Sequence, residues 1–83
     1  MKLIVTGGAG FIGSAFVRLL LGSGRDIQIT VLDKLTYAGN LDNLEPVSEH
    51  PGYRFVQGDI CDAGLVNDLV ATTQPDGIIH FAA

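Results

Sequence analysis

The stretch GGAGFIG, residues 7–13, decides the fold of this chain. It follows the short apolar run LIVT, residues 3–6, and opens the long apolar segment FIGSAFVRLLL, residues 11–21. The glycines spell G-x-G-x-x-G from Gly8 and G-x-x-G-x-x-G from Gly7, and an acid, Asp33, stands twenty residues after Gly13. A strand, this glycine pattern, a helix and an acid at that distance together predict a dinucleotide-binding turn. No Gly-Lys-Ser/Thr closes the pattern, which excludes a P-loop.

Each glycine of the pattern has a physical reason to stand where it does. Gly7 and Gly8 let the chain turn sharply off the preceding strand. Gly10 has no side chain, so a pyrophosphate can approach the backbone, and Gly13 lets the helix lie close to the sheet. The free N–H groups at the helix start, residues 11–12, then face the phosphates with the positive end of the helix dipole. The alternative is a tight strand-to-helix turn that binds no ligand.

Asp33 is predicted to end the second strand, where its carboxylate accepts hydrogen bonds from both ribose hydroxyls of an adenosine. Its negative charge repels a 2′-phosphate, which favours NAD over NADP as the cofactor. The adjacent Lys34 weakens that preference. The alternative is that Asp33 only starts or caps the loop that follows.

Two further stretches follow predicted strands. In GDI, residues 58–60, Asp59 is placed to hydrogen-bond the adenine amino group, with Ile60 packed against the ring; the alternative is a turn in which Asp62 caps the next helix. In FAA, residues 81–83, small residues end a strand beside the first one, so that a cofactor can lie over the backbone. The alternative there is core packing.

The order of elements predicts an α/β protein with a Rossmann-type doubly wound parallel sheet. The chain forms the N-terminal half of that sheet, with strand order 3-2-1-4 and right-handed crossovers. A short helical turn, residues 41–44, is expected to stop before Pro46, and Asp62 is the expected N-cap of the second helix. The predicted strands are residues 2–6, 26–33, 53–57 and 77–81, and the predicted helices are residues 11–21 and 63–73. Because the fourth strand would form an exposed apolar edge, we expect the chain to be a piece of a longer protein.

Length, charge and cysteine content exclude several functions. The chain has 83 residues, enough for one small domain, and a net charge of −4. Its five basic residues are scattered, so neither nucleic acid nor a membrane surface is expected as a partner. Cys61 is the single cysteine in the sequence, which excludes an internal disulfide and a cysteine metal cluster and fits a reducing, cytoplasmic setting. We find no spacing typical of a metal site and no set of catalytic residues.

Several residues of chemically versatile types are expected to have plain structural roles. His80 lies inside an apolar strand and is expected to be a hydrogen-bonded core histidine. Cys61 is expected to fill space, and His50, in a loop, to be solvated. A core stripe at helical spacing is predicted for Leu65, Val66, Leu69 and Val70.

The motifs resemble those of a known family. VTGGAGFIGS, residues 5–14, is similar to the start of the extended short-chain dehydrogenase/reductases, among them nucleotide-sugar epimerases and dehydratases. The loop DKLTYAGNLDNL, residues 33–44, resembles in particular that of the dTDP-glucose 4,6-dehydratases, and GDICD, residues 58–62, and HFAA, residues 80–83, agree with it. The resemblance covers the whole chain, and UDP-galactose 4-epimerases usually carry a different loop at this place.

The resemblance implies an NAD-dependent lyase that converts dTDP-glucose to dTDP-4-keto-6-deoxyglucose as a homodimer. Within it, Thr36 and Gly39 would contact the adenosine-side phosphate and ribose. The implied cofactor-binding residues are Gly7, Gly10, Phe11, Ile12, Gly13, Asp33, Lys34, Leu35, Thr36, Gly39, Asp59, Ile60 and Ala82. The family's catalytic Tyr-x-x-x-Lys does not occur in these residues, and dTDP-glucose would be bound mainly beyond residue 83. The alternatives are another nucleotide-sugar epimerase or dehydratase and a non-catalytic NAD-binding sensor module.

Overall fold

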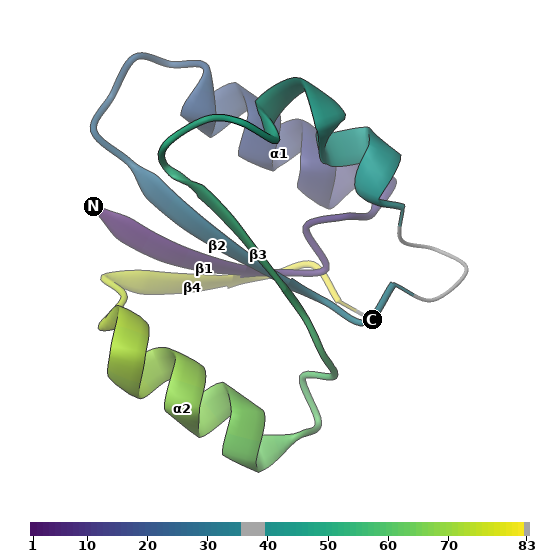
Figure 1. Cartoon of the computed structure of the whole chain (residues 1–83), viewed down its shortest axis with the longest axis vertical. Helices are drawn as coiled ribbons and strands as arrows, with labels where there is room; N and C mark the ends of the chain where they lie inside the picture. The colour runs from purple at the N-terminus through teal and green to yellow at the C-terminus, as the bar shows by residue number, and fades with distance from the viewer. Residues whose placement is uncertain (36–39, 83) are drawn as a thin grey trace.

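The computed structural model describes residues 1–35 and 40–82, which form a parallel sheet between two helical layers (Figure 1). The strands are β1 (Lys2–Thr6), β2 (Gln28–Asp33), β3 (Tyr53–Gln57) and β4 (Gly77–His80). Every pairing in this part of the chain is parallel, and the strand order is β3-β2-β1-β4. The predicted order and the Rossmann-type fold class are therefore confirmed.

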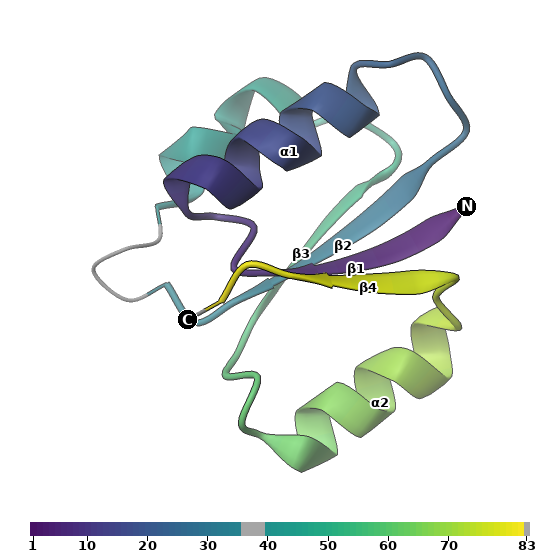
Figure 2. The ribbon, with the colours of Figure 1, turned by 180° about the vertical axis from the view of Figure 1, so that it is seen from behind.

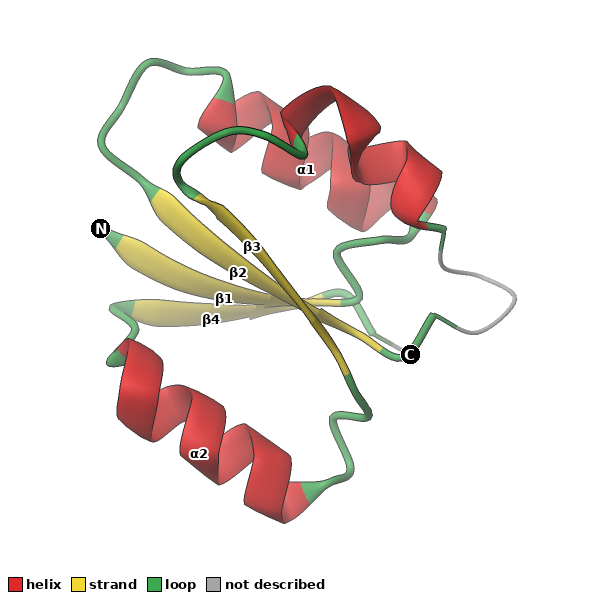
Figure 3. Cartoon of the chain, viewed as in Figure 1, coloured by secondary structure: helices red, strands yellow, loops and turns green. Residues whose placement is uncertain are grey.

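Helical elements cover both faces of the sheet. The helix α1 (Phe11–Leu21) and the 3₁₀ helix η1 (Leu41–Val47) lie on one face, and α2 (Ala63–Thr73) lies on the other (Figure 3). The view from behind in Figure 2 shows the same layers, with β4 at the edge of the sheet. Because both faces are covered, the central strands are apolar on both sides rather than alternating with polar residues. None of the described helices is long and apolar enough to cross a membrane.

The core consists of two clusters separated by the sheet. On the α1 side, Val5 and Val31 from the strands meet Val17 from α1 and Leu44 from η1, all at most 1% exposed. On the α2 side, buried Ile4, Leu32 and Leu69 form a smaller cluster, against which Val56, Leu65 and Val66 pack. The α1 side therefore contributes more apolar burial, and it is the side on which the glycine turn begins.

The helix limits follow local chemistry. Asp62 is the N-cap of α2, as predicted, because its Oδ1 accepts a hydrogen bond from the Leu65 N–H at 3.1 Å. The second strand starts at Gln28 rather than at residue 26, since the Ile27 N–H turns back to the Arg25 carbonyl at 2.9 Å. The fourth strand ends at His80, one residue earlier than predicted.

The prediction that a short helical turn stops before Pro46 is wrong. The 3₁₀ helix continues to Val47 with Pro46 inside it. A 3₁₀ helix pairs each N–H with the carbonyl three residues earlier, and proline has no N–H to offer the carbonyl of Asn43. That carbonyl instead accepts a hydrogen bond from Nη1 of Arg18 at 2.6 Å, so the helix tolerates the proline.

Several side chains are more exposed, or more engaged, than the sequence predicted. Cys61 is exposed and fills no space in the core. Val70 is 36% exposed, so the core stripe of α2 stops short of it. His80 is hydrogen-bonded as expected, through Nδ1 to Oγ1 of Thr6 at 2.5 Å, but its side chain is exposed rather than in the core. His50 is half-buried and accepts the Gly52 N–H at 2.9 Å.

We predict that Gln74→Gly raises the free energy of unfolding by about 0.5–1 kcal/mol. Gln74 ends α2 in the left-handed conformation, at φ 50°, where a β-carbon is strained and glycine is not. Urea denaturation followed by circular dichroism measures the difference. The matched control is Ala71→Gly, inside the same helix, which is expected to lower stability by about 1 kcal/mol. A Gln74→Gly variant that also loses stability would contradict the strain.

Candidate functional site

A glycine turn follows β1 at the carboxyl edge of the sheet. Gly7 has φ +69°, a conformation that strains any residue with a β-carbon. A β-carbon at Gly7 would also lie 2.5 Å from the backbone nitrogen of Ala82 and 2.8 Å from the carbonyl carbon of Phe81. Only glycine fits both demands, which confirms the turn predicted there. The same contact places Ala82, two residues after β4, directly against the turn.

Two further glycines of the pattern are required by close packing. Gly8 does not take a left-handed conformation; a β-carbon there would lie 2.7 Å from Cγ1 of Val31, so it is small because β2 packs against it. A β-carbon at Gly13 would overlap the carbonyl oxygen of Gly7. Gly13 therefore lets the first turn of α1 lie against the backbone that directly follows β1.

The start of α1 leaves its first N–H groups without an acceptor in the helix. Gly10 is the N-cap, at φ −72° and ψ 174°, and makes no side-chain cap. The first bond of the helix runs from the Ser14 N–H to the Gly10 carbonyl at 2.9 Å, so the N–H groups of the preceding helical residues have no acceptor within the helix. Phe11 and Ile12 are 85% and 70% exposed, and no acid stands in the first turn. This end keeps its positive partial charge for an anion.

The carboxylate of Asp33 joins the glycine turn to the end of β2. Its Oδ2 accepts a hydrogen bond from the Ala9 N–H at 2.9 Å, and its Oδ1 accepts one from the Leu35 N–H at 2.8 Å. The residue is 9% exposed. A carboxylate offers about four acceptor positions, so two remain after these bonds. Asp33 therefore organises the loop, as the alternative had it, and keeps two acceptor positions unused by these bonds.

The carbonyl of Ala9 is also hydrogen-bonded. It accepts hydrogen bonds from Nδ2 of Asn43 at 3.0 Å and from the Asn40 N–H at 3.1 Å. Arg18 in turn binds the backbone carbonyl of Asn43. Sequence reasoning missed Asn43 and Arg18 because no spacing rule connects them to the turn. The family-like loop at residues 33–44 contains Asn43 and was the one indication available.

Leu35 stands in a strained conformation at this edge. Its φ is 58°, in the left-handed region that a leucine adopts at a cost of about 1–2 kcal/mol. The bond from its N–H to Asp33 and the packing of its side chain on the α1-side core hold it there. Strained residues concentrate at functional sites because the surrounding structure must fix them.

The ends of β2 and β3 are linked by an ion pair. Nζ of Lys34 lies 3.3 Å from Oδ2 of Asp59, and Oδ1 of Asp59 accepts the Cys61 N–H at 2.9 Å. The Cys61 N–H and the Lys34 ammonium hold the pKa of Asp59 below its ordinary value. Ile60 beside it is half-buried. Asp62 caps α2 in the same segment. The turn before α2 and the Asp59 carboxylate after β3 are therefore both present, and one does not rule out the other.

The described members of the predicted site come from four different strand ends but meet at one edge of the sheet. Figure 1 shows these carboxyl ends together on the side of the C-terminus. Thr36 and Gly39 lie outside the described residues. The members gathered at this edge are Gly7, Gly10, Phe11, Ile12, Gly13, Asp33, Lys34, Leu35, Asp59, Ile60 and Ala82.

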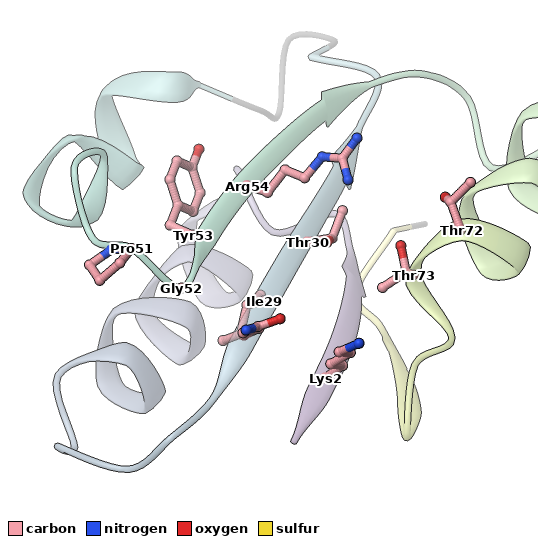
Figure 4. Close-up of a pocket in the computed structure, with 10 residues that line it drawn as sticks. Lys2, Ile29, Thr30, Pro51, Gly52, Tyr53, Arg54, Thr72 and Thr73 are labelled. Carbon is pink, nitrogen blue, oxygen red and sulfur yellow. The ribbon is translucent and has the colours of Figure 1, made fainter.

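A separate groove of about 280 Å³ lies at the opposite, amino ends of the strands (Figure 4). It is lined by Lys2, Thr30, Arg54 and Thr73, among others, and Oγ1 of Thr73 is buried with no partner in the described part of the chain. Burial raises the pKa of Tyr53 at its rim above the ordinary value. None of the residues that line this groove belongs to the glycine edge, so it is distinct from the candidate site.

A glycine turn that exposes a helix start, next to an acid at the end of the neighbouring strand, defines the class of dinucleotide-binding Rossmann proteins. Comparison with known proteins identifies one family within this class. The family model described as GDP-mannose 4,6 dehydratase matches residues 4–83, and the chain belongs to that family.

Individual relatives refine the comparison. A dTDP-glucose 4,6-dehydratase of Streptomyces niveus is 58% identical over 88 aligned residues, which cover 100% of this chain and 25% of the relative. The crystal structure of dTDP-glucose 4,6-dehydratase from Bacillus anthracis in complex with NAD has a TM-score of 0.96 and 43% identity, covering 100% of this chain and 27% of that one. DesIV, the dTDP-glucose 4,6-dehydratase of Streptomyces venezuelae, solved with NAD and TYD bound, has a TM-score of 0.92 and 54% identity, covering 100% and 26%.

These similarities confirm the resemblance that the loop at residues 33–44 indicated. They also set its extent, because the chain spans about a quarter of the length of the relatives it matches.

We predict that Asn43→Ala lowers the free energy of unfolding by about 1 kcal/mol, because the Ala9 carbonyl loses its side-chain donor. Thermal and urea denaturation measure the change. Asn67→Ala, on an exposed position of α2, is the matched control and is expected to stay within about 0.5 kcal/mol of the parent chain. Equal stability of the two variants would show that the Asn43 bond contributes nothing to the turn.

Proposed function

We propose that residues 1–83 are the amino-terminal part of the NAD-binding Rossmann domain of a dTDP-glucose 4,6-dehydratase. The observation that carries the proposal is the Asp33 carboxylate, fixed beside the glycine turn with acceptor positions to spare. The identity of 58% to a dTDP-glucose 4,6-dehydratase over the whole chain supports the particular enzyme. The remaining parts, with the Tyr-x-x-x-Lys and the sugar-nucleotide domain, belong to the rest of that protein.

The residues present fit NAD along its length. The pyrophosphate is assigned to the start of α1, where Gly10 has no side chain and the N–H groups of Phe11 and Ile12 have no acceptor within the helix. No β-carbon fits at Gly7 or Gly13, because the backbone of the turn and of the residues after β4 fills that space, so glycine is required there for the turn to keep this shape. Asp33 is assigned to the ribose hydroxyls.

The adenosine end and the far end complete the assignment. Asp59 is assigned to the adenine amino group and Ile60 to the face of the ring. Ala82, pressed against Gly7, leaves the end of β4 flat for the cofactor to lie over. Lys34, Leu35, Thr36 and Gly39 are assigned to the loop that borders the adenosine side.

The proposed reaction removes one water from dTDP-glucose and leaves dTDP-4-keto-6-deoxyglucose. NAD supplies an acceptor that takes a hydride from the sugar and later returns it, so that no net oxidation occurs. The contribution of this chain is to bind and orient the cofactor, while the acid–base groups lie elsewhere in the protein. We propose a cytoplasmic homodimer for that protein and place it among the lyases.

We predict that the full-length protein converts dTDP-glucose to a product lighter by one water, without added NAD. The cofactor is recycled within the reaction, so the cofactor retained on purification suffices. Mass spectrometry of the sugar nucleotide measures the change, and UDP-glucose is the control substrate. An unchanged mass with dTDP-glucose would contradict the dehydratase, and an epimer found by NMR with UDP-glucose would point to a sister epimerase.

We predict that Asp33→Ala weakens NAD binding by roughly 1–3 kcal/mol, because charge-assisted hydrogen bonds to the ribose are lost. Isothermal titration calorimetry on the full-length protein measures the affinity. The matched control is Asp26→Ala, which removes the same charge just before the opposite end of β2 and is expected to leave the affinity unchanged. Unchanged NAD affinity in Asp33→Ala would show that Asp33 does not bind the ribose.

A further inference from the structure

We propose that Asp59 is a specificity-determining residue that favours NAD over NADP by neutralising Lys34. The inference rests on the proposed cofactor site and adds a role for an ion pair that the binding of NAD does not itself require. A cofactor that carries a 2′-phosphate adds about 1.5–2 negative charges near the ribose at neutral pH. The charges around Asp33 therefore decide whether that phosphate is tolerated.

Lys34 is the cation placed to accept such a phosphate. Of the five basic residues in the sequence, it alone directly follows the acid that ends β2. Lys2 and Arg54 lie at the opposite groove, and Arg18 is bound to the Asn43 carbonyl. A basic side chain beside the ribose is the usual means of accommodating a 2′-phosphate. An unpaired Lys34 would therefore offset the repulsion that Asp33 exerts.

Asp59 forms an ion pair with Lys34, so Lys34 is not free to offset the repulsion that Asp33 exerts. The two groups lie 3.3 Å apart, and their side chains are 62% and 41% exposed. Asp59 is held in place because its other oxygen accepts the Cys61 N–H, so its two oxygens serve different partners. Since the same two neighbours lower its pKa, the carboxylate remains charged at neutral pH. A 2′-phosphate would then meet Asp33 without a free cation nearby.

The magnitude of the effect is set by the exposure of the pair. Exposed ion pairs change an equilibrium constant by roughly 1.4- to five-fold. Asp33 is 9% exposed and keeps its own repulsion, so it remains the larger determinant. Asp59 is thus expected to tune the preference rather than to reverse it.

The test is the ratio of the dissociation constants of NADP and NAD, measured by calorimetry on the full-length protein. Both cofactors carry the same adenine, so any loss of the adenine contact cancels in the ratio. Asp59→Asn keeps an oxygen for the Cys61 N–H and is expected to lower the ratio roughly 1.4- to five-fold. Asp68→Asn, which removes an equal charge on α2, is the control and is expected to leave the ratio unchanged.

A double-mutant cycle separates an action through Lys34 from direct repulsion by Asp59. In a Lys34→Gln background, Asp59→Asn is expected to change the ratio by much less than in the parent. An equal change in both backgrounds, or an equal change in Asp68→Asn, would overturn the inference while leaving the proposed function intact. Failure of the parent protein to bind NAD at all would overturn the proposed function and this inference together.

Discussion

The hydrogen bond from the Ala9 N–H to the Asp33 carboxylate is the interaction on which the candidate site depends. It joins the glycine turn after β1 to the end of β2 across 24 residues of sequence. Both elements are needed at one point in space if a ligand is to touch a helix start and an acid together. A carboxylate suits the position because it accepts several hydrogen bonds at once. Asp33 can therefore shape the turn and still present acceptors beyond it.

The glycine turn keeps its shape because two of its residues have no β-carbon. Gly7 and Gly13 meet each other and Ala82 so closely that no β-carbon fits at either glycine. The register of the sheet creates this crowding, because Thr6 pairs with His80 and so brings the residues that follow both strands together. The glycine pattern and the backbone that follows β4 therefore form one packing constraint. Glycine loses more backbone entropy on folding than other residues, and this cost falls at the edge of the sheet where the site lies.

Much of this could be predicted from the sequence, because it depends on local rules. Apolar segments, the Asp62 cap and the glycine spacing gave the elements and the strand order, and that order alone placed four strand ends at one edge. Two features that the sequence did not predict depend on contacts between distant residues. Pro46 stays inside η1 because Arg18, on another helix, binds the carbonyl that proline leaves free. The Asn43 bond to Ala9 is equally invisible to any pattern of spacing.

The charges along the candidate site vary in the same order as the groups of a dinucleotide. The start of α1 has no acid in its first turn and retains a positive end, which matches the two phosphates in the middle of such a ligand. The carboxylates of Asp33 and Asp59 stand at the ends of β2 and β3, where the ligand would present hydroxyls and an amino group, all of them donors. A chain with a net charge of −4 can bind an anion at this edge because the backbone of α1, rather than a cluster of basic side chains, supplies the attraction. In the proposed assignment, the fold provides the positive charge, and the carboxylates at the neighbouring strand ends select the adenosine.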